Sequence, residues 1–408
     1  MAQDFTVDRN SPKWVLGSDG YLKEYANDEP AIEFNADGSY KGVLVEPQSV
    51  NEAKASEDLD NATYWTATNT TIAGDTETDP KGGTNSFLLS ETVDNGAHFI
   101  LTALAHRPSI GSGETWTSSI FVKKGDGANA PDIIQLAHQP TTFAAGNYAN
   151  FDISVGGGTS GTVTASSGGT GRIRYYGNGW YRISFTATST SAGNAIVYIV
   201  FTNDNPTATR APSYAGQTDA NVFVWGAQLE ASKIATSYIP TTTEAVTRLK
   251  DDIYLSSASS LIGQTEGTLY VEVDWRLVSG TTQQMFMVTD GTYPFTNAVV
   301  AVKSVVDDYI DARVYKSGSA VWNEPYVSSL SGIQKIALTY SATGGKMYIN
   351  GSEVLDDAND LSFSAGTLTN VDFGQRPDKD AQANMWIRAV ALFTTRLSDA
   401  ECEDLTTI

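Results

Sequence analysis

The strongest fold signal in the chain lies in Val224-Trp225-Gly226-Ala227-Gln228-Leu229-Glu230, followed closely by Ala235-Thr236-Ser237-Tyr238-Ile239-Pro240-Thr241. The first segment alternates apolar residues with small or polar ones, which is the period of a β-strand. Pro240 has no N–H to give to a neighbouring strand, so strand pairing should stop there. We therefore predict that a long strand ends a β-rich module near residue 230.

The composition indicates an all-β protein. The chain has 408 residues, enough for two or three domains, with 18% charged residues, 36 glycines, 19 tyrosines and 8 tryptophans. Low charge with many turn residues and aromatics is typical of short, packed strands. The 47 acidic and 26 basic residues give a net charge of −21, which repels phosphate backbones and anionic lipid headgroups. We therefore expect neither nucleic-acid binding nor membrane insertion.

The cysteine content and the amino-terminal residues bear on where the chain folds. Cys402 is the one cysteine, so no intrachain disulfide framework is expected. Residues 1–30 lack the basic and apolar regions of a signal peptide, and no run approaches the ~20 apolar residues of a membrane span. We therefore expect the chain to be made and folded in a cytoplasm.

The chain divides into three regions. Residues 1–50 form a short leading segment with a hairpin signal at Ser18-Asp19-Gly20 and a strand over 42–48 that a proline ends. Residues 51–247 have strands every 15–30 residues, and Tyr181 and Phe185 should share one strand face with Ile183. We expect the leading segment to fold only against a partner, and residues 51–408 to fold without it.

Residues 248–408 predict a second sandwich. Gly267–Trp275 alternates so that Leu269, Val271, Val273 and Trp275 should face inward. Asn350-Gly351 is the favoured pair for a two-residue type I′ hairpin. Ser398 and Glu401 have the spacing of a capping box, which predicts a short final helix. The fold expected overall is all-β, with two jelly-roll-type antiparallel β-sandwiches in tandem after the leading segment.

Three sets of motifs carry a family resemblance. "GNGWYRIS" (177–184) and "VWGAQLE…TSYIPT" (224–241) resemble the carbohydrate-binding-module-like jelly roll of bacteriophage fibre and spike proteins. "GTLYVEVDW" (267–275), with "KMYINGSEV" and "RLSDAE" after it, resembles the laminin-G or concanavalin A-like lectin sandwich. The "dG" hairpin and the "GVLVE" strand resemble the start of such fibre proteins. The arginine that usually follows the proline there is replaced by Ala31, so a docking role for it does not carry over.

This resemblance implies a virion protein. The leading reading is a fibre, spike or decoration protein on the surface of a phage head or tail, assembled in the host cytoplasm. It implies virion partners bound through residues 1–50, adhesion to a host-surface polysaccharide, and a homotrimer. Two alternatives stay open: a polysaccharide-degrading lyase or glycosidase, and a purely structural appendage of capsid or tail.

No complete catalytic motif is present, so we assign no catalytic residue. Hydrolases with the lectin-like fold place three acids along one strand, but here Glu272 and Asp274 are followed by Arg276 and Leu277. Retaining hydrolysis needs a second carboxyl group ~5 Å away. We interpret the two acids as the polar face of a strand. The three histidines, His98, His106 and His138, have no metal-ligand spacing. His98 and His106 flank a strand, and one of them beside a tyrosine would suit a lyase.

Aromatic residues beside turn signals predict a sugar site, because exposed rings stack on sugar faces. They lie in two segments interpreted as loops, and the candidates are Tyr293, Phe295, Trp322, Asn323 and Tyr326. Core packing or a subunit contact is an equal alternative for Trp322 and Tyr326.

Acidic runs raise the question of calcium, which binds six to eight oxygens from flexible loops. The runs lack the order of a calcium loop, so solvated turns are the simpler interpretation and no resident metal or cofactor is assigned. The candidate ligands for calcium are Asp307, Asp308, Asp356, Asp357 and Asp360.

Overall fold

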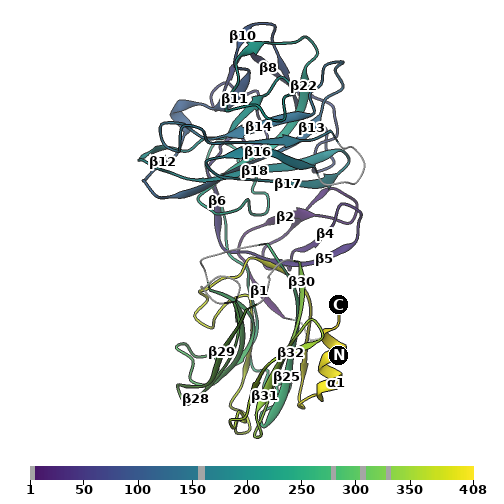
Figure 1. The fold of residues 1–408 in the computed structure, drawn as a ribbon, viewed down its shortest axis with the longest axis vertical. Helices are drawn as coiled ribbons and strands as arrows, with labels where there is room; N and C mark the ends of the chain where they lie inside the picture. Colours follow the sequence, from purple (N-terminus) through teal and green to yellow (C-terminus); the bar gives the residue numbers. More distant parts are fainter. Residues whose placement is uncertain (1–4, 155–160, 277–281, 304–308, 328–331) are drawn as a thin grey trace.

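The computed structural model describes residues 5–154, 161–276, 282–303, 309–327 and 332–408. Two antiparallel β-sandwiches lie one beyond the other along the long axis, with amino-terminal strands between them (Figure 1). A short helix, α1 (Asp399–Thr406), lies beside the second sandwich and begins with the predicted capping box. The predicted all-β class with two sandwiches in tandem is confirmed.

The first sandwich consists of two six-stranded sheets. In spatial order, one sheet contains β16 (Thr162–Ser167), β15 (Tyr148–Asp152), β14 (Ile133–Ala137), β20 (Tyr198–Phe201), β11 (Phe99–Thr102) and β7 (Trp65–Thr68). The other contains β17 (Thr170–Gly177), β18 (Trp180–Thr188), β13 (Thr115–Lys124), β22 (Asn221–Glu230), β9 (Ser86–Glu91) and β8 (Thr70–Asp75). This region of the chain also contains two short two-stranded sheets and one turn of 3₁₀ helix: β10 (Asn95–Gly96) with β21 (Tyr214–Ala215), β12 (Ser109–Ile110) with β19 (Gly193–Asn194), and η1 (Leu104–His106).

Strand β22 is the predicted closing strand, and all ten of its residues are buried. One face packs in the sandwich core, where Tyr181, Ile183 and Phe185 of β18 also lie, as their spacing predicted. The other face carries Trp225, which packs in a separate cluster with Leu16 of the leading segment. The strand is therefore buried on both faces because the amino-terminal hairpin covers its outer side.

The second sandwich consists of two seven-stranded sheets. In spatial order, one contains β1 (Thr6–Asp8), β24 (Asp252–Leu255), β33 (Asn370–Phe373), β26 (Gln283–Thr289), β27 (Ala298–Lys303), β28 (Tyr309–Lys316) and β29 (Ser319–Val327). The other contains β32 (Ser352–Asp357), β31 (Gly345–Ile349), β30 (Ile333–Ser341), β25 (Glu266–Trp275), β34 (Met385–Phe393), β5 (Tyr40–Val45) and β4 (Ile32–Phe34). Asn350 and Gly351 join β31 to β32 with φ of 51° and 81°, as a type I′ turn requires.

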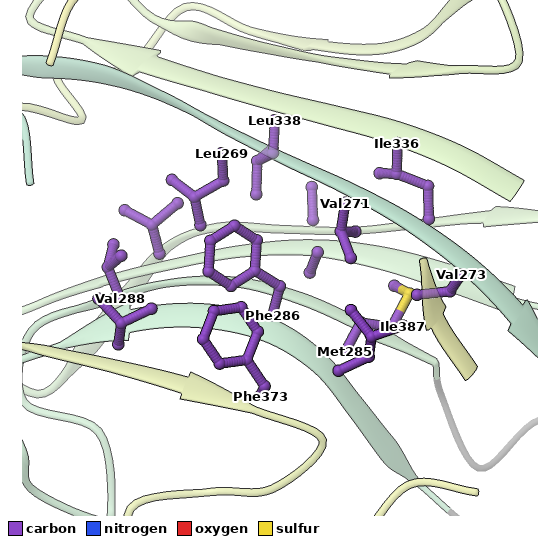
Figure 2. Close-up of a cluster of buried hydrophobic side chains, with 14 of the residues drawn as sticks. Leu269, Val271, Val273, Met285, Phe286, Val288, Ile336, Leu338, Phe373 and Ile387 are labelled. Atoms are coloured by element: carbon purple, nitrogen blue, oxygen red, sulfur yellow. The ribbon is translucent and has the colours of Figure 1, made fainter. Parts of the chain in front are cut away.

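The core of this sandwich fills the space between the two sheets (Figure 2). Leu269, Val271 and Val273 of β25 lie in this core, as their alternation predicted. Leu269 and Val271 lie above Phe286 of β26 and Phe373 of β33, and Val273 lies near Ile387 (Figure 2). The rings of Phe286 and Phe373 are stacked with their centroids 4.8 Å apart.

The leading segment is part of this body, so the expectation that it folds only against a partner is wrong. Strand β1 pairs with β24, and β5 pairs with β34, so each extends one sheet of the second sandwich. The hairpin of β2 (Lys13–Leu16) and β3 (Leu22–Tyr25) packs on the first sandwich, and β6 (Ser49–Asn51) pairs with β23 (Val246–Arg248). The second sandwich is therefore built from two distant parts of the chain, and a boundary at residue 50 cuts through it.

Buried ion pairs join the leading segment to the link between the sandwiches. Lys13 contacts Asp251 and Glu46, and Asp251 also binds Arg9. Glu46 in turn pairs with Arg276 of the second sandwich. The pKa of Glu46 is held well below its usual value, because its cationic neighbours outweigh the opposing effect of burial.

Within the described residues, no helix has the length and apolar character needed to cross a membrane.

Candidate functional site

A cleft of about 370 Å³ opens where the first sandwich faces the second, and we call it the junction cleft. Strands β17 and β18 line it on the side of the first sandwich, and Lys41 of β5 lines it on the other side. One carboxylate, Asp274, lines the cleft. Five cationic side chains line it as well: Lys41, Arg172, Arg174, Arg182 and Arg276. A concentration of positive charge thus lies inside a chain whose net charge is −21.

The alternation of β17 delivers two of these cations. Ile173 and Tyr175 pack against the core of the first sandwich, so Arg172, Arg174 and Tyr176 point outward into the junction. The same alternation turns Arg182 of β18 toward the cleft, because its neighbours in sequence lie in the core.

Two of the arginines form ion pairs with buried carboxylates that do not line the cleft. Arg174 pairs with Glu33, and Arg276 pairs with Glu46 and donates to the Ala235 carbonyl at 2.9 Å. Burial alone would raise the pKa of Glu33, but Arg174 and Arg276 outweigh it, so that pKa is lowered. These two arginines are therefore fixed in place and only partly neutralised at the cleft.

Lys41 and Arg172 are the two cations of the cleft whose side chains donate no hydrogen bond within the described structure. Lys41 Nζ forms an ion pair with Asp274 at 3.7 Å but no hydrogen bond with it, and Arg172 is exposed, with no hydrogen bond or ion pair to any residue that the structure describes. Burial and then Arg174 lower the pKa of Lys41, and partial burial and then Arg276 lower the pKa of Arg172. Each group is thus repelled by neighbouring cations, and an anion between them would relieve that repulsion.

Trp386 forms the floor of the junction cleft. Its Nε1 donates to Glu33 at 2.8 Å, and its ring is only 6% exposed. Lys41 Nζ lies 4.0 Å from the ring centroid, with the guanidinium carbons of Arg276 and Arg174 at 5.2 and 5.7 Å. The ring therefore positions the cations by cation–π contacts and is covered by them.

A second hollow, of about 380 Å³, continues the junction cleft on the other side of Lys41 and Arg174. Both residues line both hollows, and the second adds Asn35, Asp37 and Tyr175. The two hollows adjoin at these shared side chains, and we call them together the groove, which polar and apolar side chains line alike. A separate hollow of about 450 Å³ is lined by apolar side chains such as Phe5 and Phe373, which offer a sugar no hydrogen bonds.

The aromatic residues predicted as a sugar site do not form one surface. Tyr293 and Phe295 lie in the loop between β26 and β27, with ring centroids 5.2 Å apart, and Arg376 covers the Tyr293 ring at 4.1 Å. Trp322 lies in β29 and is 2% exposed in the core. The interpretation of residues 322–326 as a loop is therefore wrong, because these residues form an edge strand.

The other two residues predicted for the sugar site, Asn323 and Tyr326, lie in the same strand, β29. Asn323 is exposed, whereas Tyr326 is half-buried and packs against the core cluster that contains Trp322. Of the five residues, Tyr293 and Asn323 are thus the ones exposed to solvent, and sugar contact there stays a prediction.

The acidic residues considered for calcium are engaged in local turns. Asp357 accepts the Asn359 N–H at 2.7 Å, and Asp360 accepts the Ser362 N–H at 2.9 Å and pairs with Lys316. In the described parts of the chain, no three of the His, Cys, Asp and Glu side chains are placed together to hold a metal ion. Asp307 and Asp308 lie outside the described residues. Calcium binding, at these positions or at Asp356, stays a prediction.

Three of the residues considered for catalysis, His98, His138 and Glu272, have structural partners. His98 and His138 are fully buried, and both nitrogens of each ring face backbone carbonyl oxygens. His98 does lie beside a tyrosine, Tyr214, with ring centroids 4.7 Å apart, but it has no free nitrogen to act as a base. Glu272 accepts from Arg388 at 2.6 Å on the outer face of β25, as a structural role predicts.

The sequence interpretation missed the junction cleft. Its signal was the alternation of Arg172 and Arg174 beside Arg182 in a chain with only 26 basic residues. That pattern marks a cationic strand face, but Lys41 and Arg276 come from strands whose partners in space cannot be read from the sequence.

Comparisons with known proteins give no family. No family model matches this chain, and no curated protein matches it. Among solved structures, the CBM40 of the Ruminococcus gnavus IT-sialidase bound to α2,3-sialyllactose is 16% identical, with a TM-score of 0.33 over 37% of this chain and 87% of that one. Domain 4 of the arabinanase AbnA from Geobacillus stearothermophilus, in complex with arabinotriose, is 15% identical, with a TM-score of 0.33 over 43% and 84%.

The NanB sialidase from Streptococcus pneumoniae is 16% identical, with a TM-score of 0.30 over 37% of this chain. The match spans 26% of that enzyme's chain.

Proposed function

We propose that this protein is a surface protein of a phage virion that binds a host polysaccharide through the junction cleft. The observation that carries the glycan-binding part is the cleft itself, where five cationic side chains converge on one hollow and a second hollow adjoins it. Polar and charged groups that converge in a concave site are what a hydroxyl-rich ligand needs. The family resemblance of the two sandwich motifs supports the virion part.

In this proposal the protein is a fibre, spike or decoration protein, assembled in the host cytoplasm as a homotrimer. Its amino-terminal side would contact capsid or tail proteins. Because residues 5–51 are folded into the body, the contact would use a folded surface that includes the partly exposed Phe5. Mass photometry of the full chain tests the trimer, and a stable monomer at micromolar concentration would contradict it.

Glycan binding is tested with the labelled full-length chain on an array of neutral and acidic bacterial polysaccharides. We expect saturable binding to a subset of them, and no release of reducing ends or of unsaturated sugars. Release of such products would instead support the depolymerase alternative. Absence of binding across the array would contradict the glycan-binding function and favour a purely structural role.

The virion location has an independent test. Purified particles of the phage that encodes this chain are labelled with a gold-conjugated antibody raised against it. Gold at regular positions on head or tail is the expected result, and unlabelled particles from a lysate that contains the free protein would contradict the proposal.

A further inference from the structure

We propose that the junction cleft holds the acidic unit of an anionic polysaccharide, with the sugar's carboxylate or sulfate group between Lys41 and Arg172. This inference rests on the proposed glycan-binding function and names the ligand class for that site. The shared chemistry is a sugar-borne anion, and the experiment below separates the two anionic groups.

The first support is the balance of charge. Five cations line the cleft against one lining carboxylate, Asp274, and the carboxylates of Glu33 and Glu46 are directed at Arg174 and Arg276 from behind. Gathering like charges costs free energy in the free protein. A ligand that brings a negative charge recovers this cost, whereas a neutral sugar does not.

The second support is the supply of unused donors. The ammonium group of Lys41 is in an ion pair at 3.7 Å but makes no hydrogen bond with that carboxylate, and the guanidinium of Arg172 has no partner among the described residues. Arg182 is 5% exposed and donates to the Thr236 carbonyl and to Ser119 Oγ, which leaves its Nε as the one donor nitrogen without a hydrogen-bond partner in the described structure. Guanidinium and ammonium groups make their strongest hydrogen bonds to anionic oxygens.

The third support is the shape of the site. Lys41 and Arg174 stand where the junction cleft meets the second hollow, so a sugar anion bound at Lys41 has room for neighbouring units on both sides. Ser184 on one side and Asn35 on the other offer neutral partners for hydroxyl groups. The groove therefore fits a segment of a polymer better than a small free anion.

A nucleic acid is the other polyanion to consider. Its phosphates repeat along a long backbone, and the surrounding chain carries 47 acidic residues, which repel such a polymer outside the cleft. An acidic polysaccharide with its charges spaced along neutral units suits one local cationic site. Binding of single-stranded DNA is included below as an outcome that would overturn the proposal.

The test is isothermal titration calorimetry on the full-length chain, with oligogalacturonate, sulfated dextran oligomers, neutral dextran oligomers and oligo(dT) as probes. We expect binding of the carboxylate or the sulfate probe, weaker binding at higher salt, and none of neutral dextran. Lys41→Met/Arg172→Gln should lower the affinity by about tenfold or more, because two charge-assisted contacts are lost. The matched control, Lys124→Met/Lys316→Met, removes the same charge outside the cleft and should keep the wild-type affinity.

Arg172→Glu provides a second variant that keeps the fold, because this exposed side chain has no described partner. It should abolish binding while the melting temperature stays unchanged. Equal loss in the control, unchanged affinity in both cleft variants, or preferred binding of dextran or oligo(dT) would overturn the inference. If the array finds glycan ligands while the cleft variants bind them normally, glycan binding survives and this site assignment fails.

Discussion

Lys13 Nζ lies 2.6 Å from Asp251 Oδ2, and the two side chains are almost completely buried at the junction of the sandwiches. Lys13 belongs to the amino-terminal hairpin, and Asp251 lies 238 residues later, just before β24. The pair therefore connects the leading segment to the start of the second sandwich, behind the wall of the junction cleft that Arg276 forms.

Removing the lysine should strongly destabilise the protein. Lys13→Met leaves the buried Asp251 and Glu46 without their shared cation, and breaking a buried ion pair costs about 3–5 kcal/mol. Urea unfolding monitored by tryptophan fluorescence measures the change. Lys54→Met, at the partly exposed pair with Glu244, is the control and should cost less than ~1 kcal/mol. Equal effects of the two changes would contradict a stabilising role for the buried network.

Deletion of residues 1–50 should prevent folding of the second sandwich. The deletion strips β5 from β34 and β1 from β24, and it uncovers core residues such as Ile253 and Ile387. It also removes Lys13 and Glu46 from the buried ion network. We expect residues 51–408 to be insoluble or partly unfolded by circular dichroism and limited proteolysis. A soluble protein with the wild-type melting temperature would show that the leading segment adds nothing to the fold.

The leading segment also shows what sequence patterns resolve. The alternation over Gly267–Trp275 was enough to assign inward-facing residues, because a strand's period is local. The strand at β5 was likewise visible, but its pairing with β34, more than 300 residues later, was not. In the sequence, a short strand that completes a distant sheet has the pattern of an isolated segment, which is why the sequence predicts residues 1–50 as a separate unit.

Asp372 should make the protein less stable at alkaline pH. Burial raises the pKa of this side chain to about 7, and Asp252 adds to the effect. A folded-state pKa above the unfolded value of 3.8 gives a contribution that is present at low pH and is lost as the pH rises through about 7. Asp372→Asn should therefore raise the free energy of unfolding by about 1–3 kcal/mol at pH 8 and have little effect near pH 4.

Urea unfolding at several pH values checks this prediction. The control is Asp360→Asn, in which an exposed carboxylate is neutralised and no stabilisation at pH 8 is expected. A destabilised Asp372→Asn protein at pH 8 would mean that the carboxylate has a cationic partner in solution.

His138 should have the opposite pH dependence. Burial lowers the pKa of this histidine from 6.5 to about 4. Its contribution is therefore present above pH 6.5 and is lost as the pH falls toward 4, by about 2 kcal/mol between pH 8 and pH 5. His138→Gln removes this dependence, so the difference between wild type and variant should shrink over that range. A constant difference would indicate that His138 titrates normally in the folded protein.

The junction cleft could not be derived from the sequence, although parts of it were visible there. Arg172 and Arg174 alternate in β17, so a cationic strand face was readable. Trp322, by contrast, is a core residue, although the polar residues and the proline next to it predict a loop. Such neighbours also occur in an edge strand, so they do not distinguish the two structures. The position of Lys41 opposite Arg174 depends on the packing of the two sandwiches, which no local pattern records.

The pH dependence of binding follows from Lys41. Burial lowers the pKa of its ammonium group below the ordinary 10.5, and a bound anion requires the charged form. Affinity for an acidic oligosaccharide should therefore fall as the pH rises through this lowered pKa, and Lys41→Arg should extend binding to higher pH. Calorimetric titrations from neutral pH to above 10.5 measure this, and a wild-type affinity independent of pH over that whole range would remove Lys41 from the contact.

The most direct test of the acidic-glycan site is a crystal structure of the full-length protein with the acidic oligosaccharide that binds best in calorimetry. We predict that the anionic group of one sugar lies within hydrogen-bond distance of Lys41 Nζ and the Arg172 guanidinium, with adjoining units in the hollow beside Asn35 and Tyr175. An empty junction cleft at saturating ligand, with the sugar bound elsewhere, such as at Tyr293, would contradict the account.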